Sequence, residues 1–277
     1  MVQIGKYNTL KVVKTVDFGV YLDGGDKGEI LLPTRYVPDN CHVGDEVDVF
    51  IYLDSEDRII ATTEKPYAQV GEFAWLRVKS TNRFGAFLDW GLMKDLLVPF
   101  REQKVDMQQD CYYIVYVYLD HESSRIAASA KLNKFLDNLP ADYEFNQEVD
   151  LLVVQETEIG YKVIIDNAHW GMIYHNEIFC QVEKGDRIKG YIKNIREDEK
   201  IDVTLQPAGY EKIDSLSATI LKSLRENDGY LPLSDKSSSE QIAEYFSCSK
   251  KNFKKAIGLL YKQRTIQILE NGIRLNA

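Results

Sequence analysis

A segment of the chain is repeated in tandem, and this repeat constrains the possible folds more than any other feature of the sequence. Residues 5–23 recur 66 positions later as residues 71–89, so that Phe18-Gly19 is matched by Phe84-Gly85. A third and weaker copy begins near Glu148. Because each copy is too long to be one hairpin of a solenoid, we expect each to form a complete small domain.

Each copy is composed of short runs rich in β-branched and aromatic residues, such as residues 47–53 and 112–118. Clusters of Gly, Asp and Asn separate these runs, and this spacing is typical of an all-β barrel or sandwich. Residues 131–139, which end before Pro140, are predicted to form a short helical connector between the second and third copies.

The order of motifs within a copy resembles that of the S1 RNA-binding domain, a five-stranded β-barrel of the OB type. In the first copy the order is Phe-Gly-Val-Tyr-Leu-Asp at 18–23, a Gly-to-Pro segment at 28–33, Val-Gly-Asp at 43–45 and an Asp-to-Ile segment at 54–59. The resemblance implies three tandem S1-like OB-fold β-barrels in a mainly β multidomain chain.

In that family, two aromatic rings of the Phe-Gly-x-Phe segment lie outside the barrel and stack on nucleotide bases. The resemblance assigns this role to Phe18, Tyr21, Phe84 and Phe87. Residues three apart lie on opposite faces of a regular strand, so we expect a β-bulge at Gly19 or Gly85 to redirect one ring. The alternative, in which one or both rings pack in the barrel core, stays open.

The third copy departs from this pattern, since Ile159 and Lys162 occupy the two aromatic positions. The candidate RNA-binding residues there are Tyr161, Lys162, Tyr174 and His175. The histidine that the family often has in the next strand is replaced by Leu31, Leu97 and Tyr174. A barrel that serves only as a spacer or a protein contact is the alternative for each copy.

After Asp214 the hydrophobic period changes from two to about 3.6, which predicts helices. A first helix ends before residues 227–229, and a second begins at a capping box of Ser237 and Glu240. A third spans residues 250–263. The apolar residues expected to be buried are Leu216, Ile220, Leu221 and Leu224, then Ile242, Tyr245 and Phe246, then Phe253, Ile257 and Leu260.

The chain closes with a predicted β-hairpin whose strands flank Asn271-Gly272, a dipeptide typical of a type I′ turn. Three helices and a terminal hairpin indicate an α+β winged helix-turn-helix. In a DNA-binding winged helix the third helix enters the major groove and its basic residues contact phosphates. The candidate nucleic-acid-binding residues are Lys250, Lys251, Lys254, Lys255, Lys262 and Arg264. A solvated helix face is the alternative reading of these lysines.

The complete order of domains resembles the conserved virulence factor B family of bacterial proteins. The boundaries we expect are 1–66, 67–139, 140–208 and 213–277. The resemblance implies an RNA-binding protein that regulates gene expression, virulence genes included, with single-stranded RNA as its partner and duplex DNA or RNA as a possible ligand of the winged helix. A DNA-binding transcription regulator and a protein-interaction scaffold are the alternatives.

Charge and motif content limit the other classes of protein. The net charge is −9, but the part from Asp214 onward carries 10 Lys and Arg against 7 Asp and Glu, so only this last part is basic. The chain has no phosphate-binding loop, dinucleotide motif or H-E-x-x-H motif, and its 4 cysteines are widely spaced. We expect no enzyme activity, no catalytic residue, no cofactor and no metal ion, and a cytoplasmic protein that enters no membrane.

Overall fold

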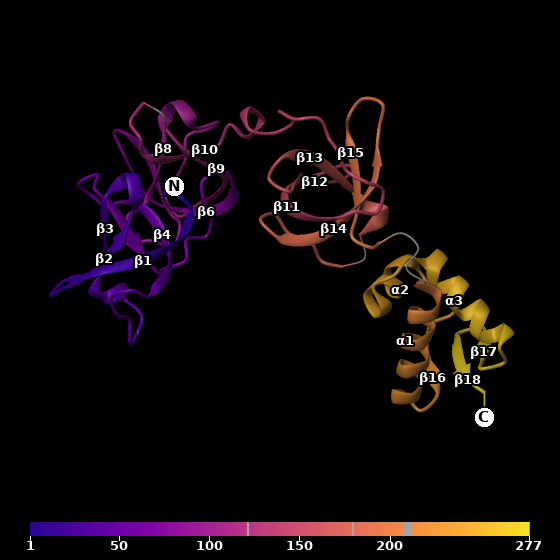
Figure 1. The fold of residues 1–277 in the computed structure, drawn as a ribbon. Coiled ribbons are helices and arrows are strands. Elements are labelled where there is room, and N and C mark those ends of the chain that lie inside the picture. The colour runs from indigo at the N-terminus through magenta and orange to yellow at the C-terminus, as the bar shows by residue number, and fades with distance from the viewer. Residues whose placement is uncertain (121, 179, 208–211, 277) are drawn as a thin grey trace. The chain divides into compact units, whose positions relative to one another are not determined.

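The computed structural model describes residues 1–120, 122–178, 180–207 and 212–276. The chain divides into two compact units, Met1–Leu139 and Pro140–Ala277. Figure 1 shows the elements of both units in chain order. Unit 1 contains two β-barrels, and unit 2 contains a third barrel and the helices.

Three closed five-stranded barrels confirm the predicted fold class. Barrel 1 consists of β1 (Tyr7–Val16), β2 (Gly19–Asp23), β3 (Glu29–Pro33), β4 (Glu46–Leu53) and β5 (Ile59–Thr62). Barrel 2 consists of β6 (Phe73–Asn82), β7 (Gly85–Asp89), β8 (Leu96–Pro99), β9 (Tyr112–Leu119) and β10 (Ile126–Ser129). Barrel 3 consists of β11 (Glu148–Thr157), β12 (Gly160–Ile165), β13 (His169–Tyr174), β14 (Arg187–Ile195) and β15 (Ile201–Thr204).

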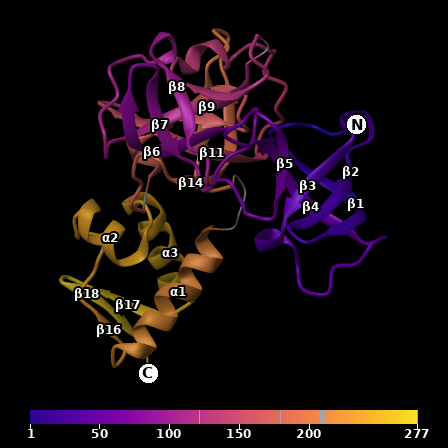
Figure 2. The same ribbon diagram turned by 90° about the vertical axis from the view of Figure 1, so that its left-hand side faces the viewer.

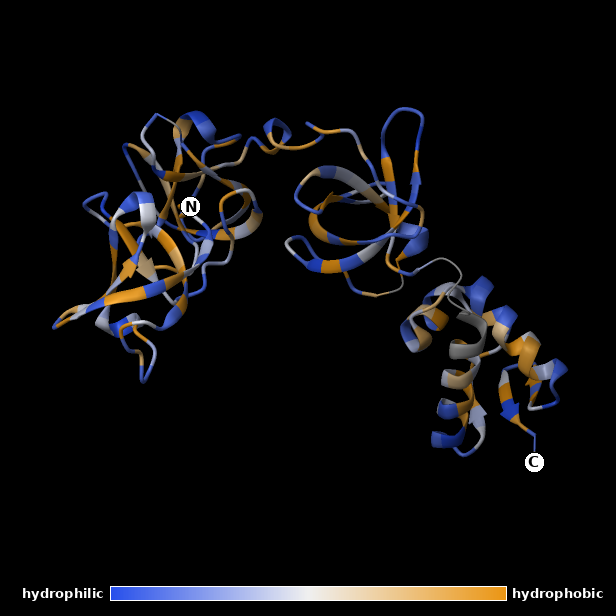
Figure 3. Ribbon diagram, in the orientation of Figure 1, coloured by the Kyte–Doolittle hydropathy of each residue, from blue (hydrophilic) through white to orange (hydrophobic). Residues whose placement is uncertain are grey.

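The three barrels share one topology, in which the third strand pairs in parallel with the fifth and the other pairs are antiparallel. Hydrophobic residues alternate with hydrophilic ones along many of these strands, as Figure 3 shows. Alternate side chains of a strand point to opposite faces, so each barrel encloses a core of its own. The long first strand closes each barrel, because it pairs with both the second and the fourth strand.

The β-bulge predicted at Gly19 lies instead in the preceding strand, where the register with β2 shifts between Val12 and Lys14. Barrels 2 and 3 repeat this shift in β6 and β11. Gly19 has another role, because a Cβ atom there would lie 2.2 Å from the carbonyl oxygen of Leu32. A glycine is therefore needed for the close approach of β2 to β3.

Barrels 1 and 2 pack directly against each other through the outer face of β4. Val49 and Ile51 point into barrel 1, whereas Phe50 and Tyr52 belong to the hydrophobic cluster of barrel 2 together with Trp90. Phe50 is 0% exposed. The strand is thus buried on both faces, which explains its nearly continuous apolar sequence.

The prediction of a helical connector at 131–139 is wrong, because the only helical part of this segment is a single 3₁₀ turn at Leu132–Lys134. Asp137 has a φ of 56°, a left-handed conformation that interrupts an α-helix. The segment is held instead by side-chain packing, since the ring of Phe135 stacks on Tyr116 with 4.0 Å between centroids. The connector therefore follows the surface of barrel 2.

The C-terminal region is a winged helix, as predicted. It consists of α1 (Lys212–Glu226), β16 (Tyr230–Leu231), α2 (Ser239–Phe246), α3 (Lys250–Lys262), β17 (Ile266–Leu269) and β18 (Gly272–Leu275). Figure 2 shows the three helices beside the small sheet, whose strand order is β16-β18-β17. No helix within the described ranges is long and apolar enough to cross a membrane.

Two local predictions for α2 need correction. The capping box is formed by Ser238 and Gln241, one residue later than expected: the Gln241 amide donates to Ser238 Oγ at 3.2 Å and the Ser238 amide donates to Gln241 Oε1 at 3.0 Å. Ile242 and Phe246 are buried as predicted, but Tyr245 is 47% exposed. Tyr245 lies one residue from the buried Phe246, and adjacent residues of a helix point about 100° apart.

The terminal hairpin is not closed by a type I′ turn. Leu269 pairs with Gly272, so that Glu270 and Asn271 form the turn, and none of these four residues has a positive φ. The glycine is required by packing, because a Cβ atom on Gly272 would lie 2.4 Å from the carbonyl oxygen of Leu231. The Asn-Gly signal located the hairpin correctly but gave the wrong turn type.

Candidate nucleic-acid interface

Barrel 1 presents an aromatic pair on its outer face. Phe18 occupies the two-residue turn between β1 and β2, where strand alternation does not apply, and the residue is 58% exposed. The ring of the half-buried Tyr21 lies 6.4 Å from that of Phe18 at an angle of 84°, and Lys14 Nζ lies 5.7 Å from the Tyr21 ring. Leu31 is directly opposite Tyr21 on β3. Both candidate rings therefore share one surface, next to a cation.

Barrel 2 repeats this arrangement with a different neighbour. Phe84 is 57% exposed, and the guanidinium of Arg83 lies 4.8 Å from the centre of its ring. Phe87 on β7 is half-buried and pairs with Leu97 on β8. Phe84 and Phe87 both line a pocket of about 360 Å³. The second aromatic face is therefore recessed.

In barrel 3, Lys162 and Tyr174 lie on the corresponding face. Lys162 Nζ lies 3.7 Å from the centre of the Trp170 ring, and Tyr174 follows Trp170 on the same side of β13. The hydroxyl of Tyr174 accepts a hydrogen bond from Arg196, whose guanidinium also donates to Asp202 at 2.9 Å. Sequence reasoning missed Trp170 and Arg196, although the alternation of residues 169–174 placed Trp170 with Tyr174.

Tyr161 points to the other face of β12, and His175 follows the end of β13. The side chain of Tyr161 packs against the core of barrel 3, and its pKa is raised by burial and by the carboxylate of Glu156. His175 is exposed, and its ring lies 5.7 Å from that of Tyr161.

The strand register also corrects the position that we assigned to Tyr174. Met172, and not Tyr174, is opposite Lys162, as Leu31 is opposite Tyr21 and Leu97 is opposite Phe87. Tyr174 pairs instead with Gly160 at the end of the strand. The place of the family's frequent histidine is therefore taken by aliphatic or thioether side chains in all three barrels.

The basic residues of the winged helix are exposed on α3 and just beyond it. Lys251, Lys254, Lys255, Lys262 and Arg264 are exposed, and Lys250 is half-buried with Glu240 close enough to interact. Among the described side chains, none of the five exposed residues takes part in an ion pair. The helix therefore offers cations that are not neutralised by these neighbours.

Comparisons with known proteins decide the family. A family model described as S1 domain matches residues 4–64 and 70–130, and one described as CvfB-like winged helix domain matches residues 218–275. The YitL protein of Bacillus subtilis (strain 168) is 30% identical over 277 residues, which cover 97% of this chain and 92% of YitL. Conserved virulence factor B of Staphylococcus aureus (strain USA300) is 28% identical over 86% of this chain and 81% of its own.

The chain belongs to the conserved virulence factor B family. A crystal structure of a multidomain protein with nucleic acid binding domains from Streptococcus pneumoniae TIGR4 is also similar, with 24% identity, a TM-score of 0.42 and coverage of 99% of this chain and 98% of that one. S1 domains followed by a winged helix are the architecture of a nucleic-acid-binding protein. Within this member of the family, barrel 3 lies outside the ranges that match the S1 domain model.

Proposed function

We propose that this protein binds single-stranded RNA and regulates gene expression after transcription, by binding and not by catalysis. The observation that carries the proposal is the pair of rings at Phe18 and Tyr21, which share one exposed face of barrel 1. Phe84 and Phe87 occupy the same positions on barrel 2.

An exposed aromatic surface favours single strands. Every base has a π face, and stacking on a ring contributes about 1–3 kcal/mol per base, but the bases of a duplex already stack on one another. Lys14 and Arg83 adjoin these rings and are placed to neutralise backbone phosphates. The acidic remainder of the barrels opposes a general attraction for a polyanion, so we expect affinity to depend on these local contacts.

The test compares ligands of one sequence on the full chain. An RNA oligonucleotide, the DNA strand of the same sequence and the corresponding DNA duplex are titrated at one fixed salt concentration, since affinities for nucleic acids depend strongly on salt. We expect the RNA strand to bind most tightly and to be recovered intact in buffer containing Mg²⁺. Equal or tighter binding of the DNA duplex, or cleavage of the RNA by protein free of contaminating nuclease, would contradict the proposal.

A DNA-binding transcription regulator is the second candidate, and the exposed lysines of α3 favour it. Phosphate contacts position a protein without carrying sequence information, so this candidate also requires base contacts from α3. It predicts duplex binding that discriminates between sequences and is lost when Lys251 and Lys255 are replaced by alanine. Binding of single-stranded RNA that survives those replacements supports the first proposal.

A further inference from the structure

The recessed face of barrel 2 is closed on one side by barrel 1. The pocket of about 360 Å³ is lined by residues of β7, β8, β9 and β10 and of the loops beside them, together with the end of β4 and the loop that follows it. Its aromatic lining consists of Phe84, Phe87, Trp90 and Tyr118 from barrel 2 and Tyr52 from barrel 1. A volume of this size lies within the range of small-molecule sites, roughly 300–1,000 Å³.

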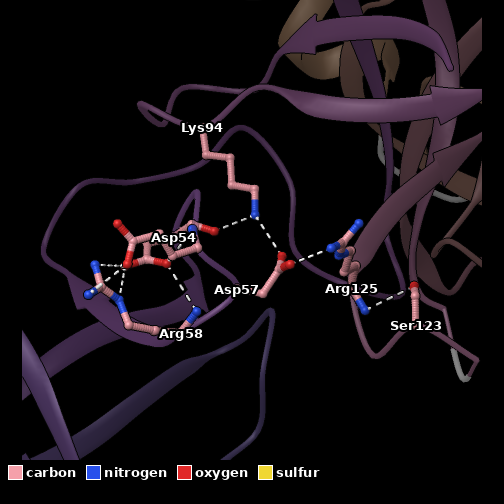
Figure 4. A network of polar contacts seen from close by, with 7 residues as sticks. Asp54, Asp57, Arg58, Lys94, Ser123 and Arg125 are labelled. Carbon is pink, nitrogen blue, oxygen red and sulfur yellow. Dashed lines mark hydrogen bonds and ion pairs between the residues drawn. The ribbon is translucent and has the colours of Figure 1, made fainter. Parts of the chain in front are cut away.

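Polar contacts between the two barrels hold the loop of barrel 1 over this face, as Figure 4 shows. Lys94 of barrel 2 donates to the backbone carbonyl of Asp54 at 2.5 Å and lies 3.5 Å from the carboxylate of Asp57. Asp57 also accepts a hydrogen bond from Arg125. The Asp54 side chain is fixed in turn by Arg58, whose Nε donates to it at 2.8 Å. The loop of barrel 1 therefore forms one wall of the pocket on barrel 2, and these contacts fix its position.

The mouth of the pocket carries groups of both charges. Arg101 is 64% exposed at its side chain and lies 4.0 Å from Asp120, at the outer limit of an ion pair. The Asp120 carboxylate accepts a hydrogen bond from Ser123 Oγ at 2.6 Å. A loosely paired guanidinium can exchange a carboxylate for a phosphate, which it binds in the same bidentate geometry.

We propose that this pocket binds one nucleotide, shared between barrels 1 and 2. The base lies against Phe84 and Phe87, and its phosphate is bound at the mouth by Arg101. The inference rests on the proposed function in taking RNA as the source of the nucleotide. A free nucleoside monophosphate presents the same chemistry, and the test separates the two sources.

The test uses the full chain with two probes, an eight-residue oligoadenylate RNA and adenosine 5′-monophosphate. Arg101→Gln is compared with Arg77→Gln, a matched control, because Arg77 is also an exposed arginine of barrel 2, lies 3.7 Å from one aspartate and does not line the pocket. Because Arg101→Gln removes a charged hydrogen bond to the phosphate, we expect it to weaken binding roughly tenfold or more. Arg77→Gln should weaken it by much less.

A second pair of variants tests the wall supplied by barrel 1. Ser55 is exposed on the loop and lines the pocket, so Ser55→Glu adds a negative charge to the wall that barrel 1 supplies and repels an anionic ligand. Val43→Glu adds the same charge to another exposed position of barrel 1 that does not line it. We expect Ser55→Glu to weaken the binding of both probes severalfold and Val43→Glu to leave it unchanged.

The outcomes are separable. If Arg101→Gln weakens the binding of both probes, the pocket takes a nucleotide from either source; if it weakens the RNA alone, the pocket takes a nucleotide only within a strand. If Arg101→Gln and Ser55→Glu match their controls while RNA still binds, the pocket is wrong and the proposed function stands. If the unaltered protein binds neither probe, both are wrong.

Discussion

The rings of Phe50 in barrel 1 and Trp90 in barrel 2 meet edge to face, with 5.8 Å between their centroids. Both side chains are almost completely buried, at 0% and 2% exposure. The indole Nε1 of Trp90 donates to the backbone carbonyl of Lys94, which positions the same lysine that reaches across to barrel 1. The contact between the barrels therefore has the packing of a protein core.

Loss of this contact should destabilise both barrels together. Removing a buried phenylalanine side chain costs about 3–5 kcal/mol, so we expect Phe50→Ala to lower the free energy of unfolding of unit 1 by that amount. Urea denaturation of the full chain measures it. The control is Phe18→Ala, at an exposed ring, which should change stability by less than about 0.5 kcal/mol. Separate unfolding transitions for barrels 1 and 2 in the unaltered protein would contradict a joint core.

The same interface contains Tyr52, which is 5% exposed. Ionisation of its hydroxyl at high pH should destabilise the contact between the barrels. Burial raises the pKa of Tyr52 from its ordinary value of 10 to about 12. A raised pKa in the folded state gives stability that is complete below pH 10 and is lost as the pH rises toward 12. In this window we expect the free energy of unfolding of the unaltered protein to fall by up to about 1.4 kcal/mol per pH unit relative to that of Tyr52→Phe. A stability difference that does not change from pH 9 to pH 12 would show that the hydroxyl is not desolvated.

The lysines of α3 should contribute to the salt dependence of binding. Each phosphate neutralised on a single strand contributes about 0.7 to the slope of log K against log salt. Replacing Lys251, Lys255 and Lys262 with glutamine should therefore reduce the slope by up to about 2. The matched control replaces the ion-paired lysines of barrel 3, which are Lys189, Lys193 and Lys200. Equal slopes for the two triple variants would mean that α3 does not contact phosphate.

The repeat predicted three barrels because a duplicated pattern of alternation and turns specifies a topology without any knowledge of contacts. The packing between copies was missed, although its signal lies in residues 47–53. Phe50 and Tyr52 fall on the outer side of a strand whose inner side is already apolar. A strand with two apolar faces is buried on both, and only the partner of the second face could not be deduced.

The local errors have physical causes of their own. The serine run offers both Ser237 with Glu240 and Ser238 with Gln241 as capping boxes, and the sequence pattern alone does not distinguish them. Tyr161 was grouped with Lys162 by sequence proximity, but adjacent residues of a strand point to opposite faces. The rule does not apply to Phe18, because Phe18 lies in a turn, and this position brings its ring beside that of Tyr21 without a bulge.

The most direct test of RNA binding through the aromatic faces removes the four rings at once. In the full chain, Phe18, Tyr21, Phe84 and Phe87 are replaced by alanine, and the dissociation constant for single-stranded RNA is measured at constant salt. The control replaces four exposed aromatic residues outside these faces, which are Tyr67, Tyr112, Phe145 and Tyr245. Stacking at about 1–3 kcal/mol per base predicts at least a tenfold loss of affinity for the first variant and little change for the control. Equal affinities for the two variants would contradict a stacking role for the barrels.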